Sequence, residues 1–145
     1  GFRKVEDFND GHVPILDGAA AADAIYTDFA AFGAMGDTNI EIMTDLNNSG
    51  TSTSTDCGSS VPVDGQNLRL KITLSSAGVV TYSLVVNAVA GAGTLAAPAT
   101  TAAFTFDDGD VVVPYIFTSS DTAAADVLWL KDLTVTRSPG ISYAN

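Results

Sequence analysis

The sequence predicts an all-β fold, an antiparallel β-sandwich with at most one short helix. Two observations lead to this prediction. Apolar and polar residues alternate strictly over residues 67–87, and roughly six to eight short apolar segments are separated by clusters of Gly, Asn, Asp and Ser. Short strands joined by such turns are typical of antiparallel sandwiches. The 145 residues fit one domain, so we expect a single sandwich domain over 1–145.

The clearest predicted element is a β-hairpin over residues 67–87. Its first half, "NLRLKITL", alternates apolar residues with Arg69, Lys71 and Thr73. The stretch "SSAG" then supplies a turn in which Gly78 can adopt a positive φ. The second half, "VVTYSLVV", repeats the alternation. Each strand therefore has one apolar face for a core and one more polar face.

The remaining elements follow from shorter patterns. The stretch "DTNIEIMTDL", residues 37–46, and the opening "GFRKVEDF" each contain the alternation of a strand. The Ser/Thr-rich residues 47–60 are predicted to form either a mobile loop or an extended edge strand. The Ala-rich residues 19–33 favour a helix and a strand equally. Residues 126–137, "DVLWLKDLTVTR", are apolar on both faces, which predicts a strand in the interior of the sandwich or against a neighbour.

The charge balance argues against two classes of partner. The chain has 6 Lys and Arg against 17 Asp and Glu, a formal net charge of −11. A nucleic-acid binder needs clustered cations to neutralise phosphates, and an anionic membrane surface also attracts cations. No uninterrupted apolar run reaches the length of about 20 residues that spans a bilayer. We therefore expect neither nucleic acid nor a membrane as a partner.

Reactive side chains are scarce in the sequence. Cys57 is the only cysteine, which excludes an intrachain disulfide and a Cys-based zinc site, and we interpret it as a small, partly buried structural residue. The single histidine, His12, lies in "DGHVP" and is interpreted as a loop residue. Neither a G-x-S-x-G motif nor a phosphate-binding glycine motif is present. We therefore predict no catalytic residues, no cofactor-binding residues and no enzyme activity.

The stretch "FTFDDGDVVVPYIF", residues 104–117, is compatible with a cation site or with a turn. Asp107, Asp108 and Asp110 are spaced like the start of a calcium loop, where carboxylates at alternate positions converge on one ion. A strand-like valine run follows them, however, and Asp-Gly is a sequence that favours β-turns. We predict a turn and keep the three aspartates as the candidates for a Ca²⁺ site. Pro114 predicts an edge or bulged strand after the turn.

Aromatic residues offer one further candidate surface. Tyr115 and Trp129 are the residues that we would assign to contact with a glycan or a protein partner, because an aromatic ring can stack on a sugar or anchor an interface. The alternative is that these residues belong to the hydrophobic core, which is the more common role of aromatics on strands.

The order of the predicted strands resembles a known group of proteins. A Ser/Thr-rich stretch is followed by "DGQNLRLKITLSSAGVVTYSLVVNAV", then by "TTAAFTFDDGDVVVPYIF" and "ADVLWLKDLTVTR". This order is similar to that of bacteriophage virion proteins that carry a concanavalin A-like jelly-roll sandwich. Ala88 replaces the glycine that usually ends the second strand in that pattern. The opening "GFRK" resembles a strand in the middle of such a domain, so we expect the chain to be the C-terminal portion of a longer domain.

The resemblance implies a structural role in a phage particle. It suggests a head decoration (cement) protein that is made in the cytoplasm of the bacterial host, sits on the capsid surface and binds the major capsid protein as a homo-oligomer. The glutamate-rich strand of glucanases with this fold has no counterpart here, and only "DDGD" resembles the calcium-bound loops of the lectins. The alternative is a carbohydrate-binding module of a phage fibre or a secreted protein.

Overall fold

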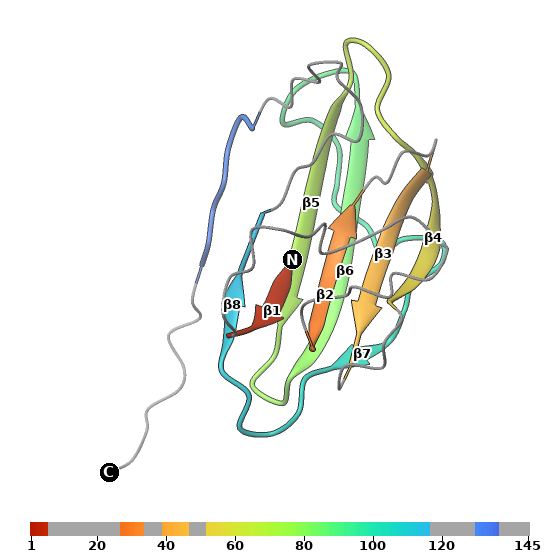
Figure 1. The fold of residues 1–145 in the computed structure, drawn as a ribbon. Coiled ribbons are helices and arrows are strands. Elements are labelled where there is room, and N and C mark those ends of the chain that lie inside the picture. Colours follow the sequence, from red (N-terminus) through yellow and green to blue (C-terminus); the bar gives the residue numbers. More distant parts are fainter. Residues whose placement is uncertain (6–26, 34–38, 47–51, 117–129, 137–145) are drawn as a thin grey trace, which may run out of the picture. The chain divides into compact units, whose positions relative to one another are not determined.

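The computed structural model describes residues 1–5, 27–33, 39–46, 52–116 and 130–136 (Figure 1). The chain divides into two compact units, Gly1–Tyr115 and Ile116–Asn145, and all described strands lie in the first unit. The described residues form strands, turns and extended segments but no helix, which confirms the prediction of an all-β fold. Within these ranges no helix has the length and hydrophobicity to cross a membrane. A single domain over 1–145 stays a prediction.

The first unit contains a five-stranded antiparallel sheet with the strand order β4-β3-β2-β1-β8. Its strands are β1 (Phe2–Lys4), β2 (Phe29–Gly33), β3 (Asn39–Asp45), β4 (Thr53–Ser60) and β8 (Val112–Pro114). Phe2–Lys4 of the opening segment and Asn39–Asp45 within residues 37–46 are strands, as predicted, and residues 6–8 of the opening segment lie outside the described residues. The sheet joins the beginning of the chain to a segment more than a hundred residues later, because β1 pairs with both β2 and β8.

The second sheet of the first unit is three-stranded, with the order β5-β6-β7. Strands β5 (Asn67–Leu74) and β6 (Val79–Asn87) form the predicted hairpin and pair continuously from Asn67↔Asn87 to Leu74↔Val80 (Figure 1). The third strand, β7 (Phe104–Thr105), pairs with the start of β6. All three strands are antiparallel, so the hairpin predicted from period-two alternation is confirmed.

The hydrophobic core lies between the two sheets and defines the sandwich. One cluster of buried side chains combines residues of both sheets and of the segment after β7: Ala30, Ile40, Ile42, Cys57, Val80, Tyr82, Leu84, Phe104 and Phe106. The rings of Phe32 on β2 and Tyr82 on β6 meet edge to face with 5.1 Å between their centroids, an arrangement that aromatic pairs favour. On the apolar face of the hairpin, β6 is buried against β2, β3 and β4, whereas the apolar residues of β5 are only partly buried or exposed.

The centre of the five-stranded sheet is also buried on its other face. Phe29, Ala31 and Met43 form a second cluster there, and Tyr115 packs against it. Phe29 and Ala30 are adjacent on β2 and both have 0% exposure, although their side chains point to opposite faces. A strand buried on both faces does not show the simple alternation of a half-exposed strand.

The structure resolves two alternatives that the sequence left open. The described end of the Ala-rich segment, Phe29–Gly33, is a strand rather than a helix. Thr53–Ser60 within the Ser/Thr-rich segment is edge strand β4, so the edge-strand alternative is correct there. The two segments pair with β3 from either side, and β-pairing to a central strand outweighs local propensity.

The prediction of a buried strand near the C-terminus is wrong for residues 130–136. This part of the second unit carries no strand assignment, and Leu130, Leu133 and Val135 are each about 60% exposed. A strand-like apolar pattern makes a segment suitable for a β-sheet. A strand forms, however, only where a neighbouring strand supplies the hydrogen bonds. Residues 130–136 have no such neighbour among the described residues.

Candidate functional site

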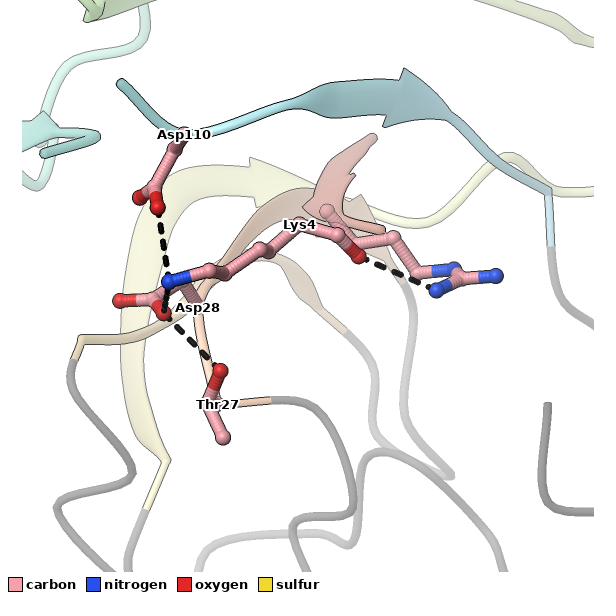
Figure 2. A network of polar contacts seen from close by, with 5 residues as sticks. Lys4, Thr27, Asp28 and Asp110 are labelled. Carbon is pink, nitrogen blue, oxygen red and sulfur yellow. Dashed lines mark hydrogen bonds and ion pairs between the residues drawn. The ribbon is translucent and has the colours of Figure 1, made fainter. Parts of the chain in front are cut away.

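A lysine held between two aspartates is the main polar cluster of the described structure. The Lys4 Nζ atom lies 2.7 Å from Asp110 Oδ1 and 3.5 Å from Asp28 Oδ2. Thr27 donates a hydrogen bond from its hydroxyl to Asp28 Oδ2 at 2.9 Å. Figure 2 shows the lysine side chain extending from β1 between the two carboxylates, with Thr27 beside Asp28. We call Lys4, Thr27, Asp28 and Asp110 the Lys4 cluster.

Strand pairing explains how these residues meet. Phe2 lies opposite Ala30 of β2 and Pro114 of β8, so β1 runs between the two strands. The Lys4 N–H donates to the carbonyl of Asp28, the residue just before β2, at 2.9 Å. Lys4 also lies opposite Val112 of β8, and Asp110 precedes Val112 by two positions and therefore points to the same face. The cluster closes one end of the inner face of the five-stranded sheet.

The cluster is largely withdrawn from solvent. The side chains of Asp28 and Asp110 are 2% and 9% exposed, and that of Lys4 is 37% exposed. A hydrogen bond to Asp110, followed by the charges of Asp110 and Asp28, raises the pKa of Lys4 above its ordinary value despite partial desolvation. Lys4 is therefore firmly cationic at neutral pH and balances two carboxylates that water reaches poorly.

The aspartates that were candidates for a cation site do not converge. Asp107, Asp108 and Gly109 are exposed, whereas Asp110 turns back to Lys4. The Asp110 N–H donates to the carbonyl of Asp107 at 3.1 Å, and Gly109 has φ +92°, so residues 107–110 form a hydrogen-bonded β-turn with glycine at its third position. The turn prediction is confirmed. Among the described residues no group of three or more His, Cys, Asp and Glu is arranged to hold a metal ion.

The other candidate residues have different outcomes. Tyr115, proposed as a glycan or partner contact, is partly buried and packs against the cluster of Phe29, Ala31 and Met43. Trp129 and His12 lie outside the described residues. The assignment of Tyr115 and Trp129 to a binding surface stays a prediction.

A surface groove of about 500 Å³ lies where β4 ends, beside the connection from β4 to β5 and the second half of β6. Its lining is hydroxyl, amide and aliphatic in character: Ser59, Ser60, Val61, Val63, Gln66, Leu84 and Val86. A second cavity of about 360 Å³ lies along β6 and β7 and is mostly apolar. The first lining differs from the aromatic platform that we associated with sugar binding.

Cys57 occupies an irregular part of β4. The pairing register with β3 shifts between Asn39 and Glu41, and Gly58 has φ +72° at this bulge. Asp56 holds the bulge together, since its carboxylate accepts hydrogen bonds from the Gly58 N–H at 2.7 Å and from Asn39 Nδ2 at 2.9 Å. The bulge places Cys57 in the core at 0% exposure.

The surroundings of Cys57 keep its thiol protonated. Burial, followed by the negative charges of Asp56 and Glu41, raises the pKa of Cys57 to about 11. Reagents attack the thiolate, and a pKa about two units above normal reduces the thiolate fraction about 100-fold near neutral pH. This supports the interpretation of Cys57 as a structural residue.

Cys57 is expected to react with the thiol reagent DTNB at least about 100-fold more slowly in the folded protein than a free cysteine does. The measurement is absorbance of the released thionitrobenzoate at pH 8, in buffer and in urea. The reaction in urea should proceed at the rate of an ordinary thiol, which serves as the control. Equal rates in buffer and urea would contradict the buried, protonated state.

Sequence reasoning missed the Lys4 cluster. The sequence pattern places Lys4 in the opening strand and Asp28 in the Ala-rich segment, and neither is among the candidate site residues. One signal was present, because Lys4 shares a strand face with Phe2, an inward-facing residue. A lysine on an apolar face needs a carboxylate partner, but only the strand order identifies Asp28 and Asp110 as those partners.

Comparisons with known proteins give no relative for this chain. No protein-family model, no curated protein sequence and no solved structure matches it.

Proposed function

We propose that this protein is a non-enzymatic structural component of a bacteriophage particle. In this proposal it is a head decoration (cement) protein with a concanavalin A-like jelly-roll topology, made in the host cytoplasm and placed on the capsid surface. It binds the major capsid protein, associates with copies of itself and stabilises the shell.

The observation that carries the proposal is the antiparallel sandwich built from the segments that resemble phage virion proteins. Residues 67–87 form the β5–β6 hairpin, and residues 104–114 form β7, the Asp107–Asp110 turn and β8. The last of these segments leaves the three-stranded sheet and joins the five-stranded one. This segment therefore connects the two sheets of the sandwich covalently.

The polar groups of the described residues support a mechanical role over a chemical one. Asp110 and Asp28 hold Lys4, Asp56 holds the β4 bulge, and the Cys57 thiol has a pKa raised to about 11. A catalytic nucleophile or base needs a pKa near the working pH and access to a substrate. The carboxylates of Asp28, Asp110 and Asp56 instead bind groups of neighbouring strands and of the β4 bulge.

Particles of the source phage provide the test. We expect the chain to sediment with purified particles, and particles lacking it to rupture at a lower temperature or in low-salt buffer, as judged by electron microscopy and DNA release. Adding back the purified chain should restore stability. A chain absent from particles, or particles equally stable without it, would overturn the proposal.

A further inference from the structure

The side of β5 that faces away from β6 is a long strand edge, which we call the β5 free edge. β5 pairs with β6 along its full eight residues and has no other strand neighbour among those described. The other sheet edges of the first unit are blunted: β8 ends in Pro114, β4 is bulged, and β7 is two residues long. β5 contains neither a proline nor a bulge. A long, regular edge of this kind can accept another strand.

The hydrogen-bonding groups on the β5 free edge follow from the hairpin register. The Ser75 N–H donates to the carbonyl of Val79 at 2.9 Å, so this pair marks a hydrogen-bonded position. Such positions alternate along an antiparallel pair, so Thr73, Lys71 and Arg69 also bond to β6. The N–H and C=O groups of the alternate residues point to the free edge: Leu68, Leu70, Ile72 and Leu74.

The β6 hydrogen bonds agree with this assignment. Leu84 lies opposite Leu70, and its N–H and C=O groups bond to Ala96 at 2.9 Å and 3.2 Å, on the side of β6 away from β5. Leu70 therefore turns its own backbone groups away from β6. Its side chain belongs to the apolar face of the hairpin yet is 41% exposed. An added strand would cover this side chain.

Two cations flank Leu70 on the opposite face of β5. Arg69 and Lys71 are both exposed, and neither forms an ion pair with any carboxylate of the described residues. Arg69 donates instead to the carbonyl of Gly91 at 3.1 Å. The chain has only 6 Lys and Arg at a net charge of −11, so this pair is a local cationic stripe on an acidic protein.

The same charges disfavour a second β5 as the occupant of the edge. When two β5 strands pair antiparallel with matching faces and overlap along most of their length, Arg69 or Lys71 lies opposite a cation of the other copy. Like charges at opposed positions destabilise a strand pair, whereas opposite charges stabilise it. The edge therefore selects for a strand that carries carboxylates.

We propose that the β5 free edge binds an extended segment of a partner protein in which apolar and acidic residues alternate. The proposal rests on the proposed function, for which it names the docking surface and the chemistry of the partner. Two carboxylates, two positions apart, face Arg69 and Lys71. The apolar residues that alternate with them extend the core face beside Leu70 and Ile72. Backbone hydrogen bonds to the edge supply affinity, and the charges supply selectivity.

The test uses a short blocked peptide that alternates valine with glutamate over the length of β5, and a control peptide with lysine in place of glutamate. Amide hydrogen exchange is followed by NMR in the whole chain. We expect the acidic peptide to slow exchange of the outward N–H groups of Leu70 and Ile72. The N–H groups of Arg69 and Lys71 already bond to β6 and serve as an internal control.

Charge reversal sharpens the test. In the double variant Arg69→Glu, Lys71→Glu, we expect the acidic peptide to bind about tenfold more weakly and the lysine peptide to bind better, because two cross-strand charge pairs change sign. Both substituted side chains are exposed, so the variant should stay folded. Unchanged exchange at Leu70 and Ile72 at saturating peptide, or equal binding of both peptides, would overturn the proposal.

Phage particles separate this proposal from the proposed function. Particles that bind the double variant as well as the natural chain would overturn the role of the β5 free edge and leave the decoration role intact. Particles that are equally stable without the chain would overturn the decoration role, while peptide binding at β5 would stand.

Discussion

Replacing Gly78 with alanine is expected to lower the free energy of unfolding by roughly 3 kcal/mol, from left-handed backbone strain together with crowding of a packed site. Gly78 has φ +77°, and a Cβ atom there would lie 2.5 Å from the carbonyl oxygen of Phe106. That oxygen belongs to the backbone, so no side-chain rotation relieves the contact. The Phe106 N–H also donates to the Gly78 carbonyl at 3.0 Å, which holds the two segments together. Urea unfolding followed by circular dichroism measures the change.

Gly65→Ala is the matched control for this substitution. Gly65 has φ +83°, but a Cβ atom there meets nothing within 4 Å. We expect this variant to lose only about 1 kcal/mol, the cost of the left-handed backbone alone. Equal losses in the two variants would show that the approach of Phe106 to the hairpin turn does not contribute.

Replacing Lys4 with methionine is expected to cause a marked drop in melting temperature. Methionine has a similar length but no charge, so Asp28 and Asp110 would face each other at one end of the core without their cation. Lys4 is partly exposed, but both carboxylates are buried, and removing their cation is costly because it leaves buried charges uncompensated. Differential scanning calorimetry of the two proteins measures the drop.

Lys71→Met is the control, since Lys71 is exposed and forms no ion pair with the described carboxylates. It should leave the melting temperature almost unchanged. Adding Asp28→Asn to Lys4→Met should recover part of the lost stability, because it removes one of the two remaining charges. A Lys4→Met variant as stable as Lys71→Met would contradict a stabilising role for the Lys4 cluster.

The raised pKa of Lys4 also predicts the pH dependence of this effect. A group with a higher pKa in the folded state holds its proton more tightly there, so its stabilisation is complete below the ordinary lysine value of 10.5. The stabilisation is lost as pH rises through the higher pKa of the folded state. The stability curves of the natural protein and of Lys4→Met should therefore approach each other in strongly alkaline solution.

Local pattern was sufficient to predict the hairpin and the Asp107–Asp110 turn. In β5 and β6 one face meets the core and the other meets solvent, so side-chain alternation reports burial directly. In the turn, Gly109 supplies the positive φ that the geometry requires. Both elements depend on contacts between residues that are close in sequence. Such contacts can be predicted from the order of residues in a single sequence.

Local pattern failed where pairing partners decide the structure. Phe29–Gly33 is Ala-rich and compatible with a helix, yet it is a strand because β1 and β3 pair with it on either side. Residues 130–136 show a strand-like pattern, yet they carry no strand assignment and no strand neighbour among the described residues. The secondary-structure propensity of a segment therefore has less influence on its conformation than the presence or absence of a neighbouring strand with which it can form hydrogen bonds.

The all-β class, the β5–β6 hairpin, the turn before β8 and the acidic charge could all be predicted, because each depends on composition or on neighbours along the chain. The position of β1 between β2 and β8, and hence the meeting of Lys4 with Asp28 and Asp110, became visible in the folded protein alone. The folded structure also shows that β5 has one strand neighbour rather than two among the described residues. Strand order joins residues far apart in sequence, and alternation along one strand carries no information about which strand lies beside it.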